Sequence, residues 1–140
     1  MRVLSLDVGD RTVGVAVSDP TGVIATPVVT IKRGESVDRD IEEIVSLANA
    51  YEVGEIVVGL PISLGNRQTA QTRKVTEFTE RLKESIQIPV VYYDERYTTK
   101  IAHSVLYEAG IKSRHHKKVV DQLSAVIILE DFLESRRNRN

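Results

Sequence analysis

Residues 4–19 read LSLDVGDRTVGVAVSD, and this stretch decides the expected fold. Apolar and small or polar side chains alternate on both sides of a short turn at residues 8–11, which predicts two strands joined as an antiparallel hairpin. Gly14 and Ala16 leave one face of the second strand almost bare, so a helix or a ligand can approach it closely. With a third strand expected from Pro27 to Ile31, the chain should begin as an antiparallel meander.

Beyond the meander, the pattern changes to alternating helices and strands. Residues 55–60, EIVVGL, form a nearly continuous apolar run, which is typical of a central strand covered on both faces. A fifth strand is expected at 88–93, and helical stripes are expected at 41–51, 75–86, 101–109 and 118–134. The sequence therefore predicts an α/β fold with a mixed five-stranded sheet, three antiparallel strands followed by βα units, and helices on both faces.

Size and composition favour one domain without disulfides. The chain has 140 residues, 28% of them charged, and no cysteine, so disulfides and thiolate metal sites are excluded and a reducing cytosol fits. We expect a single domain over residues 1–135 and a basic, frayed tail at 136–140. The start lacks the apolar core of a signal peptide, and no apolar run approaches the roughly 20 residues that span a bilayer.

Two acidic residues stand at the ends of expected strands. Asp7 ends the first strand and Glu95 follows the fifth. Ligand sites in open α/β sheets lie at the carboxyl ends of parallel strands, so both carboxylates would face one crevice if those strands are neighbours. In isolation, Asp7 could equally cap a turn, and Glu95 could pair with Arg96 or Lys100 at the surface.

A third acidic residue, Asp121, heads an apolar helical stripe formed by Ala125, Ile128 and Phe132. A lone carboxylate buried there would lose several kcal/mol to desolvation unless it is paired or binds a cation. Lys117, one turn earlier, is one possible partner, and a divalent metal shared with Asp7 and Glu95 is the other. Oxygen ligands without cysteine favour Mg²⁺ or Mn²⁺, and two such ions roughly 4 Å apart can hydrolyse a phosphodiester.

Basic residues next to these carboxylates are candidate phosphate contacts. Residues 112–118 read KSRHHKK and are expected to form a loop before the last helix. Such runs are often merely solvated, but the position beside the acidic residues favours nucleic-acid contact. Arg11 and Arg96 could hold phosphates or pair with Asp10 and Asp94. The candidate nucleic-acid-binding residues are Arg11, Arg96, Lys112, Arg114, Lys117 and Lys118, while Tyr92, Tyr93 and Tyr97 are open to either base stacking or packing.

Four motifs, LSLDVGDRTVGVAVSD, VVGLP, YDERYTT and KKVVDQLSAVIILEDFL, follow one another over essentially the whole chain. In this order they make the chain resemble the YqgF family of RNase H-like proteins, whose members are described as pre-16S rRNA nucleases and as Holliday junction resolvases. The resemblance implies an RNase H-like fold, a cytoplasmic bacterial protein and metal-dependent hydrolysis of nucleic acid. By motif position, the acidic residues of the family fall on Asp7, Glu95 and Asp121.

Three functional hypotheses follow. The leading one is an endonuclease in which Asp7, Glu95 and Asp121 hold two Mg²⁺ or Mn²⁺ ions and act on ribosomal RNA precursors, with branched DNA as the alternative substrate. The second is an ATP-binding domain of the actin and sugar-kinase kind, because those proteins share an Asp-x-Gly hairpin. The third is a non-catalytic nucleic-acid-binding module. The expected partners are nucleic acid and precursor ribosomal particles, not membranes, and the chain could act as a monomer or a homodimer.

Overall fold

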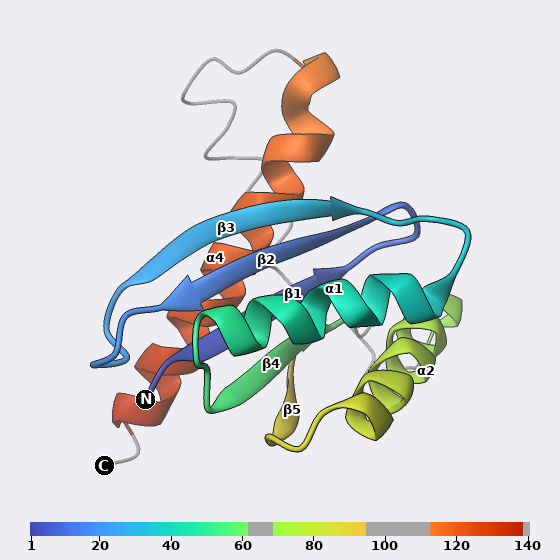
Figure 1. Ribbon diagram of the computed structural model, residues 1–140. Coiled ribbons are helices and arrows are strands. Elements are labelled where there is room, and N and C mark those ends of the chain that lie inside the picture. The colour runs from blue at the N-terminus through green and yellow to red at the C-terminus, as the bar shows by residue number, and fades with distance from the viewer. Residues whose placement is uncertain (62–68, 95–112, 139–140) are drawn as a thin grey trace.

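The computed structural model describes residues 1–61, 69–94 and 113–138, with the side chains of the last range described from 123 to 137. It contains one mixed sheet with the strand order β3-β2-β1-β4-β5 (Figure 1). The strands are β1 (Val3–Val8), β2 (Thr12–Ser18), β3 (Ala25–Lys32), β4 (Glu55–Leu60) and β5 (Val90–Asp94). The described helices are α1 (Val37–Ala50), α2 (Ala70–Ser85) and α4 (Ser113–Asn138).

The pairing of the strands confirms the meander followed by βα units. β1 pairs antiparallel with β2, and β2 pairs antiparallel with β3. β1 then pairs parallel with β4, and β4 pairs parallel with β5. Helices α1 and α2 make the crossovers that parallel pairing requires. β1 and β5 are therefore not direct neighbours, because β4 lies between them, and all three end at the same edge of the sheet.

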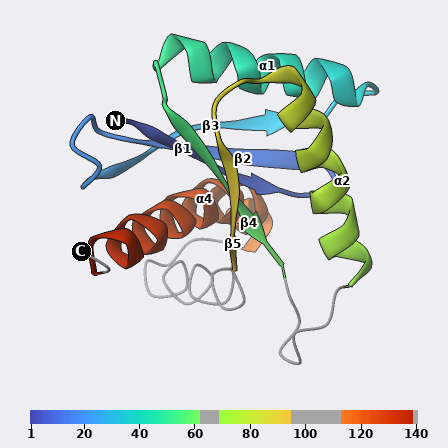
Figure 2. The ribbon, with the colours of Figure 1, turned by 90° about the horizontal axis from the view of Figure 1, so that it is seen from below.

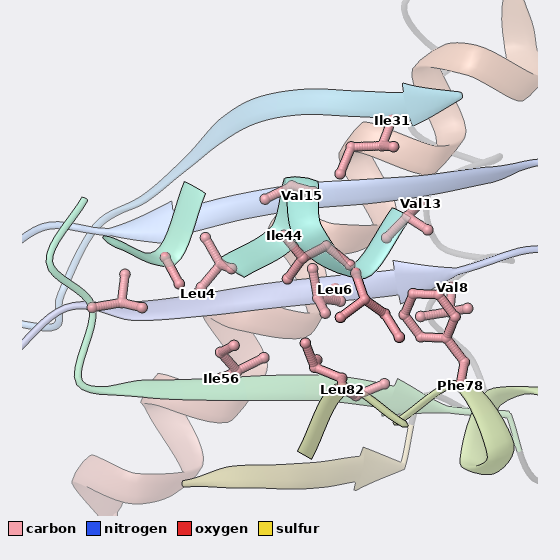
Figure 3. Close-up of a cluster of buried hydrophobic side chains, with 14 of the residues drawn as sticks. Leu4, Leu6, Val8, Val13, Val15, Ile31, Ile44, Ile56, Phe78 and Leu82 are labelled. Carbon is pink, nitrogen blue, oxygen red and sulfur yellow. The ribbon is translucent and has the colours of Figure 1, made fainter. Parts of the chain in front are cut away.

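Helices cover both faces of the sheet, as predicted. Figure 2 shows α1 and α2 on one face and α4 on the other. The alternation along β1 explains this arrangement, because Leu4, Leu6 and Val8 enter the core beneath α1 and α2 (Figure 3). Val3, at the opposite phase, packs with Ala16 and Ala125 beneath α4. The bare face of β2 therefore receives a helix.

The last helix begins earlier than expected. Residues 113–118, which we predicted as a loop, belong to α4. Arginine and lysine have good helix propensities, and the run contains neither glycine nor proline. We predicted a loop because the run is strongly charged, although its residues are compatible with a helix. The expected helix at 101–109 lies outside the described residues.

The expectation of a frayed tail from residue 136 is wrong for its first residues, because α4 continues to Asn138. Arg136 makes an ion pair with the buried Glu55, with Nη1–Oε1 at 2.7 Å and Nη2–Oε2 at 2.9 Å. Its guanidinium also lies 4.4 Å from the ring centroid of Phe132, and Arg137 Nη1 donates to the carbonyl of Gly22 at 3.3 Å. These contacts hold the end of the helix against the start of β4 and the β2–β3 turn.

Candidate active site

Asp7 lies near the end of β1, on the face of the sheet that α4 covers. Ser5, two residues earlier and therefore on the same face, donates its Oγ proton to the carbonyl of Ala125 at 2.7 Å. Across the sheet, Asp7 stands opposite Gly14 of β2, and Gly14 stands opposite Thr30 of β3. On the strand β2, the residue next to Asp7 is therefore a glycine, which has no side chain.

The other neighbour of Asp7 is also a glycine. Leu6 pairs with Val58, so the next position of β4, Gly59, is level with Asp7. Gly59 in turn pairs with Tyr93 of β5. Thr30, Gly14, Asp7, Gly59 and Tyr93 thus form one row across the sheet, which we call the Asp7 row. Within it, the carboxylate is flanked on both sides by positions without a Cβ.

Helix α4 runs over this face in the direction opposite to β1. Near the start of the strand, Val3 is level with Glu55, which Arg136 binds. Further along the strand, Ser5 meets Ala125, eleven residues earlier in the helix. Moving along β1 toward Asp7 therefore corresponds to moving toward the N-terminus of α4.

Asp121 precedes Ala125 by one turn of α4, or about 6 Å of helix, in the direction of Asp7. Ala125 and Ile128, four and seven positions after Asp121, are fully buried against the sheet. The structure therefore places the backbone of Asp121 on the helix that covers the Asp7 row. Its side chain lies outside the description.

The third predicted carboxylate, Glu95, also lies outside the described residues. The chain is described up to Asp94, which ends β5 and pairs with Leu60. β1 and β5 are two strand spacings apart, or roughly 9.6 Å, and they end at the same edge. β5 thus ends at the edge to which Asp7 is close.

The turn after Asp7 is held from two directions. Within it, the Gly9 N–H donates to the Thr12 carbonyl at 2.8 Å, and a Cβ on Gly9 would come within 3.1 Å of that oxygen. Arg33 Nη1 donates to the Gly9 carbonyl at 2.7 Å, while Arg33 Nε lies 3.4 Å from the buried carboxylate of Asp40. These contacts fix the backbone that follows the candidate metal ligand Asp7.

The candidate phosphate contacts are only partly described. Arg11 is exposed at the tip of the β1–β2 turn. Asp10, which we considered as its partner, instead makes an ion pair with Lys74 of α2, Nζ to Oδ1, at 3.3 Å. Arg114, Lys117 and Lys118 lie in the first turns of α4, without described side chains, and Arg96 and Lys112 lie outside the described residues.

Two of the three candidate stacking tyrosines serve as packing residues. The ring of Tyr93 lies edge-on to Phe132 of α4, with 6.1 Å between centroids. Tyr92 points to the opposite face, where Lys83 Nζ lies 5.2 Å from its ring centroid and burial raises the pKa of its hydroxyl. Tyr97 lies outside the described residues.

Within the residues that the structure describes, no group of three or more His, Cys, Asp or Glu side chains is arranged to hold a metal ion. Of the three predicted ligands, only Asp7 has a described side chain. Two observations nevertheless fit a hard divalent cation. The donor is a carboxylate, and the positions beside it on both neighbouring strands are glycines, which carry no Cβ.

Sequence reasoning overlooked Gly59 and two buried hydroxyls. A glycine inside a central strand is itself a signal of close approach to the backbone, so Gly59 could have been noticed within EIVVGL. Thr30 Oγ1, in the Asp7 row, and Ser124 Oγ are buried without a hydrogen-bond partner in the described structure. Nothing in the sequence distinguishes these two hydroxyls from ordinary strand and helix residues.

None of the helices in the described ranges is both long enough and apolar enough to cross a membrane.

Comparisons with known proteins give a consistent result. A family model described as "RuvX: Holliday junction resolvase" matches residues 1–135. A relative from Thermoanaerobacter pseudethanolicus is 46% identical over 140 residues, covering 99% of this chain and 100% of the relative. A relative from Clostridium tetani is 44% identical over 139 residues, covering 99% of this chain and 100% of the relative. The names of both describe a pre-16S rRNA nuclease.

Among solved structures, this chain is similar to Thermus thermophilus RuvC in complex with a Holliday junction substrate. The TM-score is 0.63 at 16% identity, and the match covers 98% of this chain and 96% of that one. A second structure of Thermus thermophilus RuvC matches with a TM-score of 0.58 at 14% identity, over 99% and 97% of the two chains. These matches confirm the RNase H-like fold.

Proposed function

This chain belongs to the RuvX family, and from that premise we propose that it is a metal-dependent endonuclease acting on structured nucleic acid. The observation that carries the metal dependence is the setting of Asp7. This carboxylate stands near the carboxyl end of β1, between two glycines, beneath the helix that carries Asp121. Glu95 follows the strand that ends at the same edge.

In this proposal, Asp7, Glu95 and Asp121 hold two Mg²⁺ or Mn²⁺ ions. The spacing of the elements supports such a pair. Two ions about 4 Å apart, each about 2.1 Å from its outer ligand, span roughly 8 Å, and β1 and β5 are roughly 9.6 Å apart. When bound, the ions supply an activated water and stabilise the leaving oxygen of the phosphodiester.

The protein itself orients the nucleic acid. Arg11 projects from a turn that Arg33 holds in place, so its guanidinium can bind a phosphate oxygen beside Asp7. Arg114, Lys117 and Lys118 stand in the first turns of α4, before Asp121, and Arg96 and Lys112 complete the proposed set. Because these contacts are electrostatic, binding should weaken steeply as salt is raised.

For the substrate, we propose the 5′ end of the 16S rRNA precursor, since the names of both relatives describe a pre-16S rRNA nuclease. The protein would then act in the cytoplasm, on free RNA or on precursor ribosomal particles, and one subunit suffices for a single strand. A second candidate is a Holliday junction, which the description of the family model supports. That substrate has two-fold symmetry and would favour a homodimer.

Cleavage by pure protein tests the proposal. A 16S precursor RNA with its 5′ extension, a four-way DNA junction and a linear duplex would each be incubated with Mg²⁺ or Mn²⁺. Wild type should cut the precursor RNA, and Asp7→Asn should lose at least about a hundredfold in rate because the substitution removes a charged metal ligand. Asp10→Asn is the matched control, since Asp10 is exposed in the turn and pairs with Lys74.

Each alternative makes a different prediction in this assay. Equal cleavage by wild type and Asp7→Asn would reject the assignment of the site. Salt-sensitive binding without cleavage would favour the non-catalytic module instead. Cleavage of the junction but not of the RNA would favour the second substrate. Micromolar binding of ATP would revive the ATP-binding hypothesis, against which the family match over residues 1–135 argues.

A further inference from the structure

A groove opens between the start of α1 and the helix α2, on the face of the sheet opposite α4 (Figure 2). It has a volume of about 230 Å³ and is lined by Arg33, Val37, Lys74, Glu77, Phe78 and Arg81. The four lining residues of α2 recur at spacings of three and four positions, so they form one stripe of the helix. All six are distinct from the candidate metal ligands and from the candidate phosphate contacts.

Phe78 and Arg33 lie at the base of the groove. Phe78 is 3% exposed and belongs to the core beneath α1 and α2, and the Arg33 guanidinium lies 5.0 Å from its ring centroid. Arg33 also pairs with the buried Asp40 and donates to the Gly9 carbonyl, so its position is fixed and its charge is compensated. A ligand in the groove would therefore be bound mainly by the other two cations of the lining.

These two cations, Lys74 and Arg81, are held only weakly by the protein. Lys74 pairs with Asp10 at 3.3 Å, and these side chains are 60% and 62% exposed. Arg81 pairs with Asp38, and these side chains are 51% and 71% exposed. Exposed ion pairs contribute little, because water and salt screen them. Both cations can therefore exchange their carboxylate partners for phosphate oxygens with little loss.

The dimensions of the groove favour a strand over a small molecule. Its volume is below the roughly 300–1,000 Å³ of typical small-molecule pockets. Lys74 and Arg81 are seven residues apart, which is about 10.5 Å along the helix, so they are spaced to follow a chain of phosphates rather than to enclose one small anion. Proteins that bind single-stranded nucleic acid use grooves lined by cations to track the backbone in this way.

The groove is continuous with the β1–β2 turn. Two cations of its lining contact this turn, at Gly9 and Asp10, and the next residue of the turn is the exposed Arg11, a candidate phosphate contact. Because the turn lies at the edge of the sheet, it joins the Asp7 side to the side of the groove. A strand bound at Arg11 would therefore reach Lys74 next.

We propose that this groove binds the phosphate backbone of the nucleic-acid substrate beyond the cleavage site, with Lys74 and Arg81 each holding one phosphate. The inference rests on the proposed function, because it takes nucleic acid as the substrate. Glu77, which is exposed on the same stripe between the two cations, repels a phosphate and weakens the binding. Loss of a cation and loss of this carboxylate should therefore change the affinity in opposite directions.

The test measures binding without cleavage. Fluorescence anisotropy in EDTA would give the dissociation constant of a single-stranded RNA, the 5′ extension of the 16S precursor, for wild type, Lys74→Ala, Arg81→Ala and Glu77→Gln over a range of salt concentrations. One lost phosphate contact lowers the slope of log affinity against log salt by roughly 0.7, which corresponds to about fivefold weaker binding at 0.1 M salt. We expect this loss for each cation variant and tighter binding for Glu77→Gln.

Lys83→Ala is the matched control. It removes the same charge from the same helix, but Lys83 is nine residues from Lys74 and therefore lies half a turn around α2, where it contacts the ring of Tyr92. Its RNA affinity should stay within about twofold of wild type, because no phosphate contact is lost. The melting temperatures of Lys74→Ala and Arg81→Ala should match that of wild type, since both side chains are exposed.

Unchanged RNA affinity and salt dependence in Lys74→Ala and Arg81→Ala would overturn the inference and leave the proposed nuclease intact. An equal loss in Lys83→Ala would overturn it too, because the effect would then reflect net charge rather than the groove. RNA binding that depends on the groove, in a protein that cuts no nucleic acid with Mg²⁺ or Mn²⁺, would instead support the inference and refute the proposed nuclease. The two failures are therefore distinguishable.

Discussion

Replacing Arg136 by alanine should destabilise the protein far more than an exposed arginine normally would. The carboxylate of Glu55 is only 10% exposed and accepts two bonds from Arg136, at 2.7 and 2.9 Å. Removing one partner of a buried pair costs about 3–5 kcal/mol because the other charge is left uncompensated. The Arg136 side chain is 43% exposed, so water offsets part of that loss, and we expect about 2 kcal/mol.

The assay is unfolding in urea. With a slope of about 2 kcal/mol per molar urea for a domain of this size, Arg136→Ala should lower the midpoint by about 1 M. Adding Glu55→Gln to Arg136→Ala removes the carboxylate charge that is left without its partner. The free energy of unfolding of the double variant should therefore recover roughly 1 kcal/mol of the loss. Arg137→Ala is the control, because its exposed side chain makes one bond of 3.3 Å, and it should stay within about 0.5 kcal/mol of wild type.

A loss below about 0.5 kcal/mol for Arg136→Ala would refute this reasoning. The pair would then behave as an ordinary surface ion pair, and it would not fix the end of α4 on the sheet. The candidate site would also be affected. The direction of α4 over β1 depends on two contacts, that of Arg136 with Glu55 and that of Ala125 with Ser5, and the first of these would no longer support it.

Three further predictions concern side chains whose contacts are described. Ser5→Ala removes the buried bond to the Ala125 carbonyl and should cost about 1 kcal/mol in urea unfolding, whereas no change would mean that the bond contributes nothing. The pKa of Asp19 is held well below its usual range by a hydroxyl and two backbone N–H groups, so its stabilising effect is present above about pH 4 and is lost as pH falls further. The stability difference between wild type and Asp19→Asn should therefore shrink below pH 4, and a constant difference would contradict this. Burial, followed by the nearby charge of Glu134, raises the pKa of Asp131, so Asp131→Asn should raise the melting temperature at pH 7 but not at acidic pH, and an unchanged melting temperature at pH 7 would count against that account.

Most of the fold could be predicted from local patterns of apolar and polar residues. The alternation of Leu4, Leu6 and Val8 with Val3 and Ser5 correctly predicted the strand β1, and the structure shows that these two sets line separate cores. Strand order was beyond such reasoning, because it depends on pairings between distant segments. In particular, β4 inserts between β1 and β5, so Asp7 and the end of β5 are separated by one strand rather than adjacent.

The two errors in the limits of α4 arose because both of its ends are rich in charged residues. Residues 113–118 were read as a loop because hydrophobic periodicity is the main sequence signal for a helix, and a basic run carries none. The end of α4 was read as frayed because Glu55, the partner of Arg136, lies 81 positions away in the sequence. Gly59 was passed over because its position beside Asp7 depends on the register between β1 and β4, which the sequence does not give.

The central claim is that Asp7, Glu95 and Asp121 converge on bound cations, and diffraction from crystals soaked in Mn²⁺ tests it most directly. Anomalous density should appear within about 2.3 Å of an Asp7 carboxylate oxygen, with the other two carboxylates around it. Density elsewhere, or an Asp7 carboxylate neutralised by an arginine or lysine in crystals that bind no Mn²⁺, would contradict the account.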